Sequence, residues 1–381
     1  MNGIYFDNAA TSFPKAPGVA EAMAKYITQI GSNVNRSTYD SSYEAAEVVY
    51  NTREMLCELF NFSKPENVVF TKNVTEGLNI LIKGLLKHGD HVIVSSLEHN
   101  AVMRPLASLM DVGVQVTRIP FSITGELDIS KLRDAIRSNT KAIIMTHASN
   151  VSGTVLDLKA VGKMCREFGS YFIVDTAQTA GSRKVDIEEL CADAIAFTGH
   201  KGLLGPQGIG GILIKENLAD KVKPLIEGGT GSFSDSEYQP THLPDKFESG
   251  TLNIPGIFGL HGALKYLKNV GIETVQKHEL ELTTTFIEGL RGIDSIKIIG
   301  PEDAKNRVPV ISIDFLNKDN ADVANILCQN YNIMTRCGLH CAPNAHKILG
   351  TFPQGTVRFS FGCFNTLKEI KFALAAISKI V

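Results

Sequence analysis

Short apolar runs and longer amphipathic stretches alternate between residues 65 and 215. The short runs are rich in β-branched residues and predict strands at residues 67–71, 91–95, 114–119, 141–146, 171–175, 193–197 and 210–214. The stretches with apolar residues at helical spacing predict helices at residues 76–87, 101–110, 128–138 and 158–168. Strands joined by crossover helices indicate an α/β domain with a mainly parallel seven-stranded sheet. In such sheets, ligands bind beyond the carboxyl ends of the strands.

The pattern changes after Gly250. Helices are predicted at residues 259–270, 274–292, 320–329 and 367–380, and strands at residues 308–315 and 357–361. This mixture indicates a second, smaller α+β domain. We expect the boundary near residues 250–260, where Gly250, Pro255 and Gly256 cluster.

Composition excludes several classes of protein. Lysine and arginine total 38 against 40 aspartate and glutamate, a net charge of -2, so no global charge favours nucleic acid or an anionic membrane. No apolar run approaches the ~18 residues of a membrane span, and the N-terminus lacks the pattern of a signal peptide. The seven cysteines are odd in number and mostly scattered, which is typical of a reducing compartment rather than a disulfide framework. We therefore expect a cytoplasmic protein.

Two candidate residues follow predicted strands of the same sheet. Lys201 lies among glycines after strand 193–197, where loss of hydration would favour the neutral amine that forms a Schiff base. Asp175 ends strand 171–175. A lysine and a carboxylate so placed are the two protein groups that a pyridoxal phosphate enzyme requires. The alternatives are a surface lysine and a helix capping box formed by Asp175 and Gln178.

Three further residues are weaker candidates when taken singly. Thr75 is a plausible N-cap of the helix that begins near residue 76, where free N–H groups would bind a phosphate. His99 follows a strand, so its imidazole could stack on an aromatic cofactor or lie in solvent. Cys341 lies between His340 and Ala342-Pro343, which suggests a surface loop in which a neighbouring cation could favour a reactive thiolate. The competing interpretations are a small buried hydrophobic residue, a metal site with Cys337 and a disulfide with Cys337.

Eight segments occur together in one family order. They are DNAAT (7–11), NVTEGLN (73–79), EHN (98–100), SNVSGT (149–154), DTAQ (175–178), TGHK (198–201), ESGT (248–251) and RCGLHC (336–341). With these, the chain resembles the class V aminotransferase-fold pyridoxal phosphate enzymes, specifically cysteine desulfurases and selenocysteine lyases. The resemblance implies the fold type I architecture of pyridoxal phosphate transferases. It also implies a large domain of residues 16–257 and a small domain of residues 1–15 and 258–381.

The resemblance implies a role for each matching cofactor-binding residue. Lys201 would carry the cofactor and act as catalytic base, Asp175 would pair with the ring nitrogen, Gln178 would bond the ring's phenolic oxygen, and His99 would stack on the ring. The phosphate would be held by the Val74 N–H, Thr75, Thr198 and His200, and by Thr251 from the partner subunit of a homodimer. Many relatives carry two adjacent hydroxyl residues where this chain has Val74 and Thr75.

The implied reaction converts L-cysteine to L-alanine. Asn150 and Arg358 would bind the substrate carboxylate, and Cys341 would take the sulfur as a persulfide before passing it to an acceptor. The segment from Arg336 to Gly350 is short, which resembles the second group of the family and favours a dedicated protein acceptor. Selenocysteine lyase activity is the nearest alternative, followed by another class V aminotransferase or β-lyase reaction.

A nucleotide-binding module is a different class of function. The sequence feature that suggests it is the glycine-rich stretch 205–211. This stretch precedes a strand and fits neither the dinucleotide-binding nor the P-loop spacing.

Overall fold

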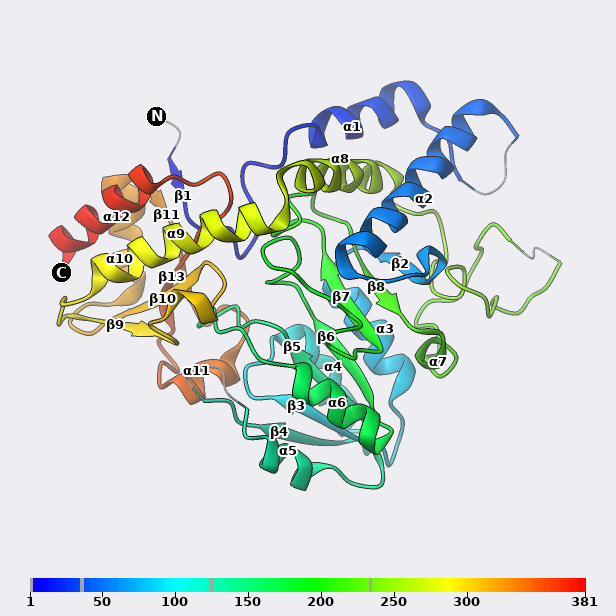
Figure 1. Cartoon of the computed structure of the whole chain (residues 1–381), viewed down its shortest axis with the longest axis horizontal. Coiled ribbons are helices and arrows are strands. Elements are labelled where there is room, and N and C mark those ends of the chain that lie inside the picture. Colours follow the sequence, from blue (N-terminus) through cyan, green and yellow to red (C-terminus); the bar gives the residue numbers. More distant parts are fainter. Residues whose placement is uncertain (1–2, 35–37, 123–126, 233–234) are drawn as a thin grey trace.

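The central sheet has seven strands in the order β2-β8-β7-β6-β5-β3-β4 (Figure 1). In this computed structural model, which describes residues 3–34, 38–122, 127–232 and 235–381, β8 runs antiparallel to both of its neighbours and the other strand pairs are parallel. The strands are β2 (Val68–Thr71), β3 (His91–Ser95), β4 (Gln115–Ile119), β5 (Thr140–Thr146), β6 (Tyr171–Asp175), β7 (Ala194–Thr198) and β8 (Gly210–Ile214). The predicted mainly parallel seven-stranded sheet is confirmed. β8 reverses direction because a parallel neighbour needs a long crossover, whereas a helix-free loop joins β7 to β8.

Alternate residues of these strands face two hydrophobic cores. In β6, Phe172 and Val174 belong to one core and Ile173 belongs to the other. The first core is covered by α2 (Asp40–Phe60), α5 (Ile129–Ala135), α6 (Lys159–Phe168) and α8 (Ile254–Val270). The second is covered by α3 (Val74–Leu85), α4 (Asn100–Met110) and the short α7 (Glu216–Ala219), so both faces of the sheet are buried.

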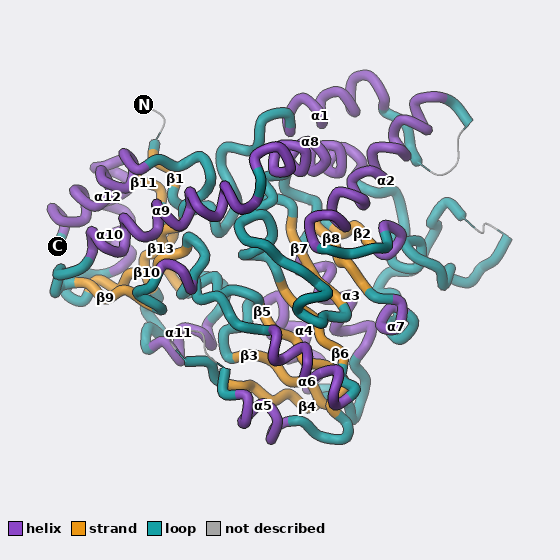
Figure 2. The backbone as a smooth tube through the Cα atoms, in the orientation of Figure 1, coloured by secondary structure: helices purple, strands orange, loops and turns teal. Residues whose placement is uncertain are grey.

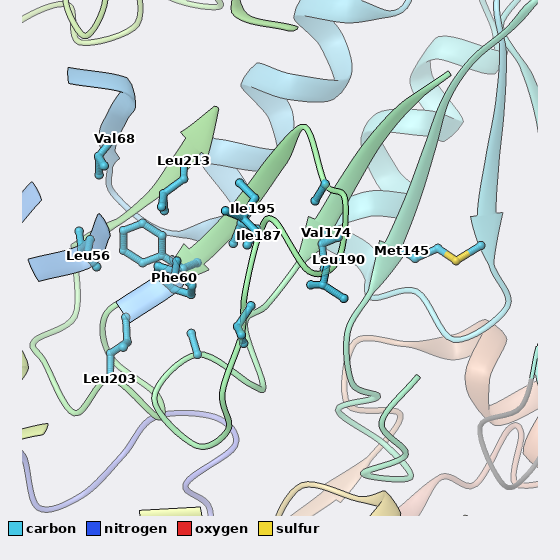
Figure 3. Packing of buried hydrophobic residues seen from close by; sticks show 14 of the residues in the cluster. Leu56, Phe60, Val68, Met145, Val174, Ile187, Leu190, Ile195, Leu203 and Leu213 are labelled. Atoms are coloured by element: carbon cyan, nitrogen blue, oxygen red, sulfur yellow. The ribbon is translucent and has the colours of Figure 1, made fainter. Parts of the chain in front are cut away.

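Figure 3 shows how α2 packs on the sheet. Leu56 and Phe60 lie beside Leu213 of β8 and Ile195 of β7, and the Phe60 ring centroid is 5.8 Å from that of Phe197. Leu56 and Phe60 are both fully buried. Side chains of this size contribute about 1.5–3 kcal/mol each when they are buried.

The second unit lies to the left of the central sheet in Figure 2. Its four-stranded antiparallel sheet has the order β12-β13-β10-β9, formed by β9 (Ile296–Ile299), β10 (Val310–Phe315), β12 (Arg336–Gly338) and β13 (Thr356–Ser360). It carries α9 (Ile272–Leu290), α10 (Asn320–Tyr331), α11 (Pro343–Leu349) and α12 (Leu367–Ile380). Near the N-terminus, β1 (Ile4–Tyr5) pairs in parallel with β11 (Ile333–Met334). The next residue, Phe6, packs against Phe361 in the hydrophobic core of the second unit. The start of the chain therefore belongs to the second unit.

The cluster of Gly250, Pro255 and Gly256 marks the start of a helix, α8. Asn253 caps α8 by accepting a hydrogen bond from Gly256 N at 3.1 Å, and Pro255 lies in the first turn of the helix. α8 therefore begins five residues before the predicted helix, and its buried residues share the core of the central sheet. The division into residues 16–257 and the remainder stays a prediction.

Several elements have no counterpart among the predicted ones. These are β1, α1 (Val19–Lys25), the π-helical turn Tyr26–Ile30, α2, α7, β9, β11, β12 and α11. Within the described residues, no helix combines the length and apolarity needed to cross a membrane.

Candidate active site

Lys201 lies just beyond β7, in a loop that enters the space between the two units. It lines an open pocket together with Gln178, Ala9 and Glu279. Burial lowers the pKa of the Lys201 ammonium to about 8, with Arg358 and Arg336 acting in the same direction. Asp175 opposes this shift, which places its charge within electrostatic reach of the lysine. A lysine in this state releases its proton near neutral pH and can act as a nucleophile.

Asp175 ends β6 and is buried. Its Oδ1 accepts a hydrogen bond from Ala177 N at 2.9 Å, and burial raises the pKa of the carboxyl group. The described residues that follow form turns rather than a helix, so the alternative of a helix capping box with Gln178 is wrong. Gln178 instead donates from Nε2 to Ala9 O at 3.2 Å.

The start of α3 differs from its prediction. The N-cap is Asn73, whose Oδ1 accepts from Glu76 N at 3.0 Å, and the helix begins at Val74. Thr75 lies exposed in the first turn, so its expected place as N-cap is wrong. An N-cap needs extended backbone and a short side-chain acceptor, and Asn73 supplies both. The N–H groups of Val74 and Thr75 remain at a helix start, where an anion is stabilised.

Two buried polar atoms without a partner among the described residues lie at and just beyond the end of β7. Thr198 Oγ1 and His200 Nδ1 are buried, and neither has a hydrogen-bond partner among the described residues. Gly210 of β8 pairs with Thr198 of β7. A Cβ atom on Gly210 would come within 2.8 Å of Asn73 Cα, so this glycine lets the start of α3 approach β8 closely. A phosphate fits this arrangement because it would satisfy the free hydroxyl, the imidazole and the helix N–H groups together.

Thr251 lies exposed on the surface. With Glu76 and Gly208 it lines a second open pocket at the start of α3. Its implied contact across a homodimer interface stays a prediction.

His99 is the N-cap of α4. Its Nδ1 accepts from Ala101 N at 3.0 Å, which leaves the ring proton on Nε2. Burial lowers the pKa of His99 to about 4, and the positive charge of Lys201 acts in the same direction. The ring is therefore neutral at physiological pH.

Arg358 and Asn150 lie together. The Arg358 guanidinium is fully buried, binds Asp7 Oδ1 through Nη2 at 2.8 Å and donates from Nη1 to Asn150 O at 3.1 Å. Its Nε has no partner among the described residues. Asn150 Nδ2 donates to His340 O at 2.5 Å and so connects this cluster to the cysteine segment. A buried cation with unused donor capacity fits a carboxylate ligand.

Cys341 lies exposed between β12 and α11. Its Sγ accepts a hydrogen bond from Arg336 Nη2 at 3.8 Å, and its carbonyl accepts from Asn100 N, beside His99, at 2.9 Å. His340 and Cys341 both have positive φ angles, of 46° and 59°, a conformation that costs energy in side-chain-bearing residues and turns the chain sharply here. The structure thus brings Cys341 to the edge of the same site as His99 and Lys201.

The two neighbouring cysteines differ in exposure, since Cys337 is half-buried and Cys341 is exposed. Cys337 and Cys341 are both free thiols, and burial raises the pKa of Cys337. Among the described residues, no group of three His, Cys, Asp or Glu side chains could hold a metal ion.

Three residues of the site were missed as individual candidates. Asp7 and Glu98 lie within motifs that were noted, but local sequence does not reveal that Asp7 pairs with Arg358 or that Glu98 is buried. Arg336 was noted as the first residue of a motif without a role of its own, and its contact with Cys341 depends on the turn between them.

Comparisons with known proteins agree with this geometry. The aminotransferase class V family model matches residues 4–372. A probable cysteine desulfurase of Methanothermobacter thermautotrophicus is 36% identical over 372 residues, which cover 97% of this chain and 92% of that protein. A probable cysteine desulfurase of Pyrococcus abyssi is 35% identical over 385 residues, covering 99% of this chain and 94% of that protein.

Solved structures agree as well. The apo structure of cysteine desulfurase from Thermococcus onnurineus NA1 superposes with a TM-score of 0.93 at 34% identity, covering 100% of this chain and 94% of that chain. The structure of the cysteine desulfurase CsdA from Escherichia coli gives a TM-score of 0.89 at 27% identity, covering 99% and 94%. In sequence and in fold, this chain belongs to the aminotransferase class V family.

Proposed function

We propose that the protein is a pyridoxal phosphate-dependent cysteine desulfurase, which converts L-cysteine to L-alanine and transfers the sulfur to Cys341. The observation that carries the proposal is the exposed Cys341 thiol, which contacts Arg336 at 3.8 Å and lies within electrostatic reach of the partly neutralised Lys201. The family implies the cofactor, and the similar proteins named cysteine desulfurase support the reaction.

The cofactor supplies an electron sink for the bond that is broken at the substrate's α-carbon. Thr198, His200 and the first N–H groups of α3 would hold its phosphate, because they carry unsatisfied capacity for an anion. Asp175 would hold the proton of the ring nitrogen, and His99 would cover the ring face. Gln178 would bind the phenolic oxygen in place of its present bond to Ala9 O.

The chain's own residues would divide the remaining work. Arg358 and Asn150 would bind the substrate carboxylate and orient the α-carbon toward Lys201. Lys201 Nζ, whose pKa of about 8 permits both states near neutral pH, would take the α-proton and return a proton to the product.

Sulfur transfer requires one further residue. Cys341 Sγ would form a bond to the substrate sulfur as the carbon–sulfur bond breaks, so the products are alanine and an enzyme persulfide without any external oxidant. Arg336 would orient the thiolate for this step. The persulfide would then pass to a protein acceptor, for which the exposed position of Cys341 leaves room.

The test is Cys341→Ala, compared with Cys328→Ala, which removes an exposed free cysteine on α10. Alanine formation from L-cysteine and from L-selenocysteine is measured in parallel with sulfide, selenide and protein persulfide. We expect Cys341→Ala to keep the cofactor's yellow colour and to lose persulfide formation, with a smaller loss toward selenocysteine because selenium is the better leaving group. Cys328→Ala should behave as the wild type.

Two outcomes would contradict the proposal. Unchanged desulfuration in Cys341→Ala would remove this residue from the reaction. Alanine production by Lys201→Ala would contradict the assignment of the lysine.

A further inference from the structure

Glu98 is a buried carboxyl group that the proposed reaction does not use. It lies in the turn between β3 and α4, directly before His99, and its side chain is 1% exposed. Its Oε1 accepts a hydrogen bond from Thr146 N at 2.9 Å and another from the Ser95 hydroxyl group. The side chain therefore ties the carboxyl end of β3 to that of β5.

This connection reaches Asp175 through the sheet. Thr146 pairs directly with Asp175 in the register of β5 and β6, and His147 N donates to Asp175 O at 2.8 Å. Glu98 thus supports the backbone on one side of Asp175 and the His99 turn on the other. Movement of its carboxyl group would displace both residues.

The two oxygens of Glu98 have different surroundings. Oε1 accepts two hydrogen bonds, as a carbonyl oxygen can. Oε2 is buried and has no hydrogen-bond partner among the described residues. Burial raises the pKa of Glu98 to about 8, and the nearby Asp175 charge acts in the same direction. A buried carboxylate oxygen with no donor is costly, so the uncharged form with its proton on Oε2 is favoured.

We propose that Glu98 is a neutral positioning residue, which holds His99 and the Thr146 end of β5 in place and leaves Asp175 as the anion that faces the cofactor ring. The inference rests on the proposed function, because it takes Asp175 to bind the ring nitrogen. The charge that acts on this carboxyl group is that of Asp175 on β6, and His99 is its neighbour along the chain. A second carboxylate charge would alter the balance between Asp175 and Lys201.

The test is a pH titration of the visible absorbance of the bound cofactor in the holoenzyme. Wild type is compared with Glu98→Gln, which keeps the shape and the neutral hydrogen bonding, and with Asp175→Asn, which removes the proposed anion. Glu167→Gln is the control, since Glu167 is an exposed carboxylate paired with Arg133. Cofactor retention after dialysis is measured for each variant.

If Glu98 is neutral, the midpoint of the absorbance titration below pH 7 should be the same in Glu98→Gln and in wild type, to within about 0.3 pH units. Asp175→Asn should lower this midpoint by about one pH unit or more. Wild type should also show a spectral change near pH 8, where Glu98 ionises, and Glu98→Gln should lack it. Glu98→Leu should lose cofactor about tenfold more readily, because it lacks both hydrogen bonds.

The inference is overturned if Glu98→Gln lowers the midpoint as Asp175→Asn does, because Glu98 is then ionised in the wild type. It is also overturned if Glu98→Leu retains the cofactor as well as wild type does. These outcomes differ from a failure of the proposed function, in which wild type itself would bind no pyridoxal phosphate or would form no alanine from cysteine.

Discussion

Burial shifts the pKa values of individual residues of the site in opposite directions. It lowers the pKa of Lys201 to about 8, and it raises the pKa of Glu98 to about 8. Both shifts have one cause, since removal of water disfavours the charged form of a base and of an acid alike. The residues that result, a lysine that releases its proton readily and a neutral carboxyl group, do not occur at these positions in an unfolded chain.

Arg358 offers a test at the scale of one side chain. Arg358→Lys keeps the charge but loses the planar donor set that binds Asp7 and Asn150. We expect the KM for cysteine to rise about tenfold with a smaller change in kcat, because the proposed carboxylate site would lose its planar donors. Steady-state kinetics of alanine formation measures both constants.

Arg133→Lys is the matched control, because Arg133 makes an exposed ion pair with Glu167. A similar rise in KM for the control, or an unchanged KM in Arg358→Lys, would contradict the role of Arg358.

At the scale of the element, the beginning of α3 contains a structural residue, Asn73, and a residue proposed to bind the cofactor, Thr75. Asn73→Ala should lower the free energy of unfolding by about 1 kcal/mol, because it removes the cap of Glu76 N. Thr75→Val should leave this stability nearly unchanged and should weaken cofactor binding about tenfold, because it removes a hydroxyl from the proposed phosphate site. Urea denaturation of the apoprotein and titration with pyridoxal phosphate measure the two effects. If Thr75→Val lowers the free energy of unfolding and Asn73→Ala does not, Thr75 rather than Asn73 is the cap.

Elements with a clear period were predictable from sequence, and β3, β6, β8 and α12 have the predicted bounds. α2 was missed although it is long. Its buried face includes Thr52 and Arg53, and these polar residues interrupt the apolar period on which the prediction depends. Arg53 is stable there because it pairs with Glu248 at 2.8 Å and lies over the Phe70 ring, contacts with residues distant in sequence.

The Arg53–Glu248 pair gives a test at the scale of the whole molecule. It joins α2 to the segment that carries Thr251, and both side chains are buried. Arg53→Met should lower the free energy of unfolding by about 3–5 kcal/mol, because it leaves Glu248 buried and unpaired. Arg53→Met combined with Glu248→Gln should recover part of the loss. Urea denaturation of both variants measures their free energies of unfolding. If the single and double variants lose the same free energy, lost packing rather than the unpaired charge causes the destabilisation.

Buried histidines give the molecule a pH dependence. Burial lowers the pKa of His147 to about 4 in the folded protein, whereas an unfolded histidine titrates near pH 6.5. Below about pH 6.5 the unfolded chain binds the proton and the folded one does not, so stability present at pH 7 is lost as the pH falls toward 4. His147→Gln should therefore reduce the decline in unfolding free energy between about pH 7 and 5. An identical decline in the variant, measured by urea denaturation, would exclude His147 as a source.

The sequence alone determined what depends on neighbours along the chain. Period and composition place the strands of the central sheet, and Asp175 and Lys201 follow from them at or just beyond the carboxyl ends of β6 and β7. Tertiary structure decided the remainder: the direction of β8, the pairing of Asp7 with Arg358, and the unpartnered oxygen of Glu98. The physical reason is that a period is a local property, whereas burial and charge pairing depend on segments that meet only in the folded chain, as Asp7 and Arg358 do across 351 positions.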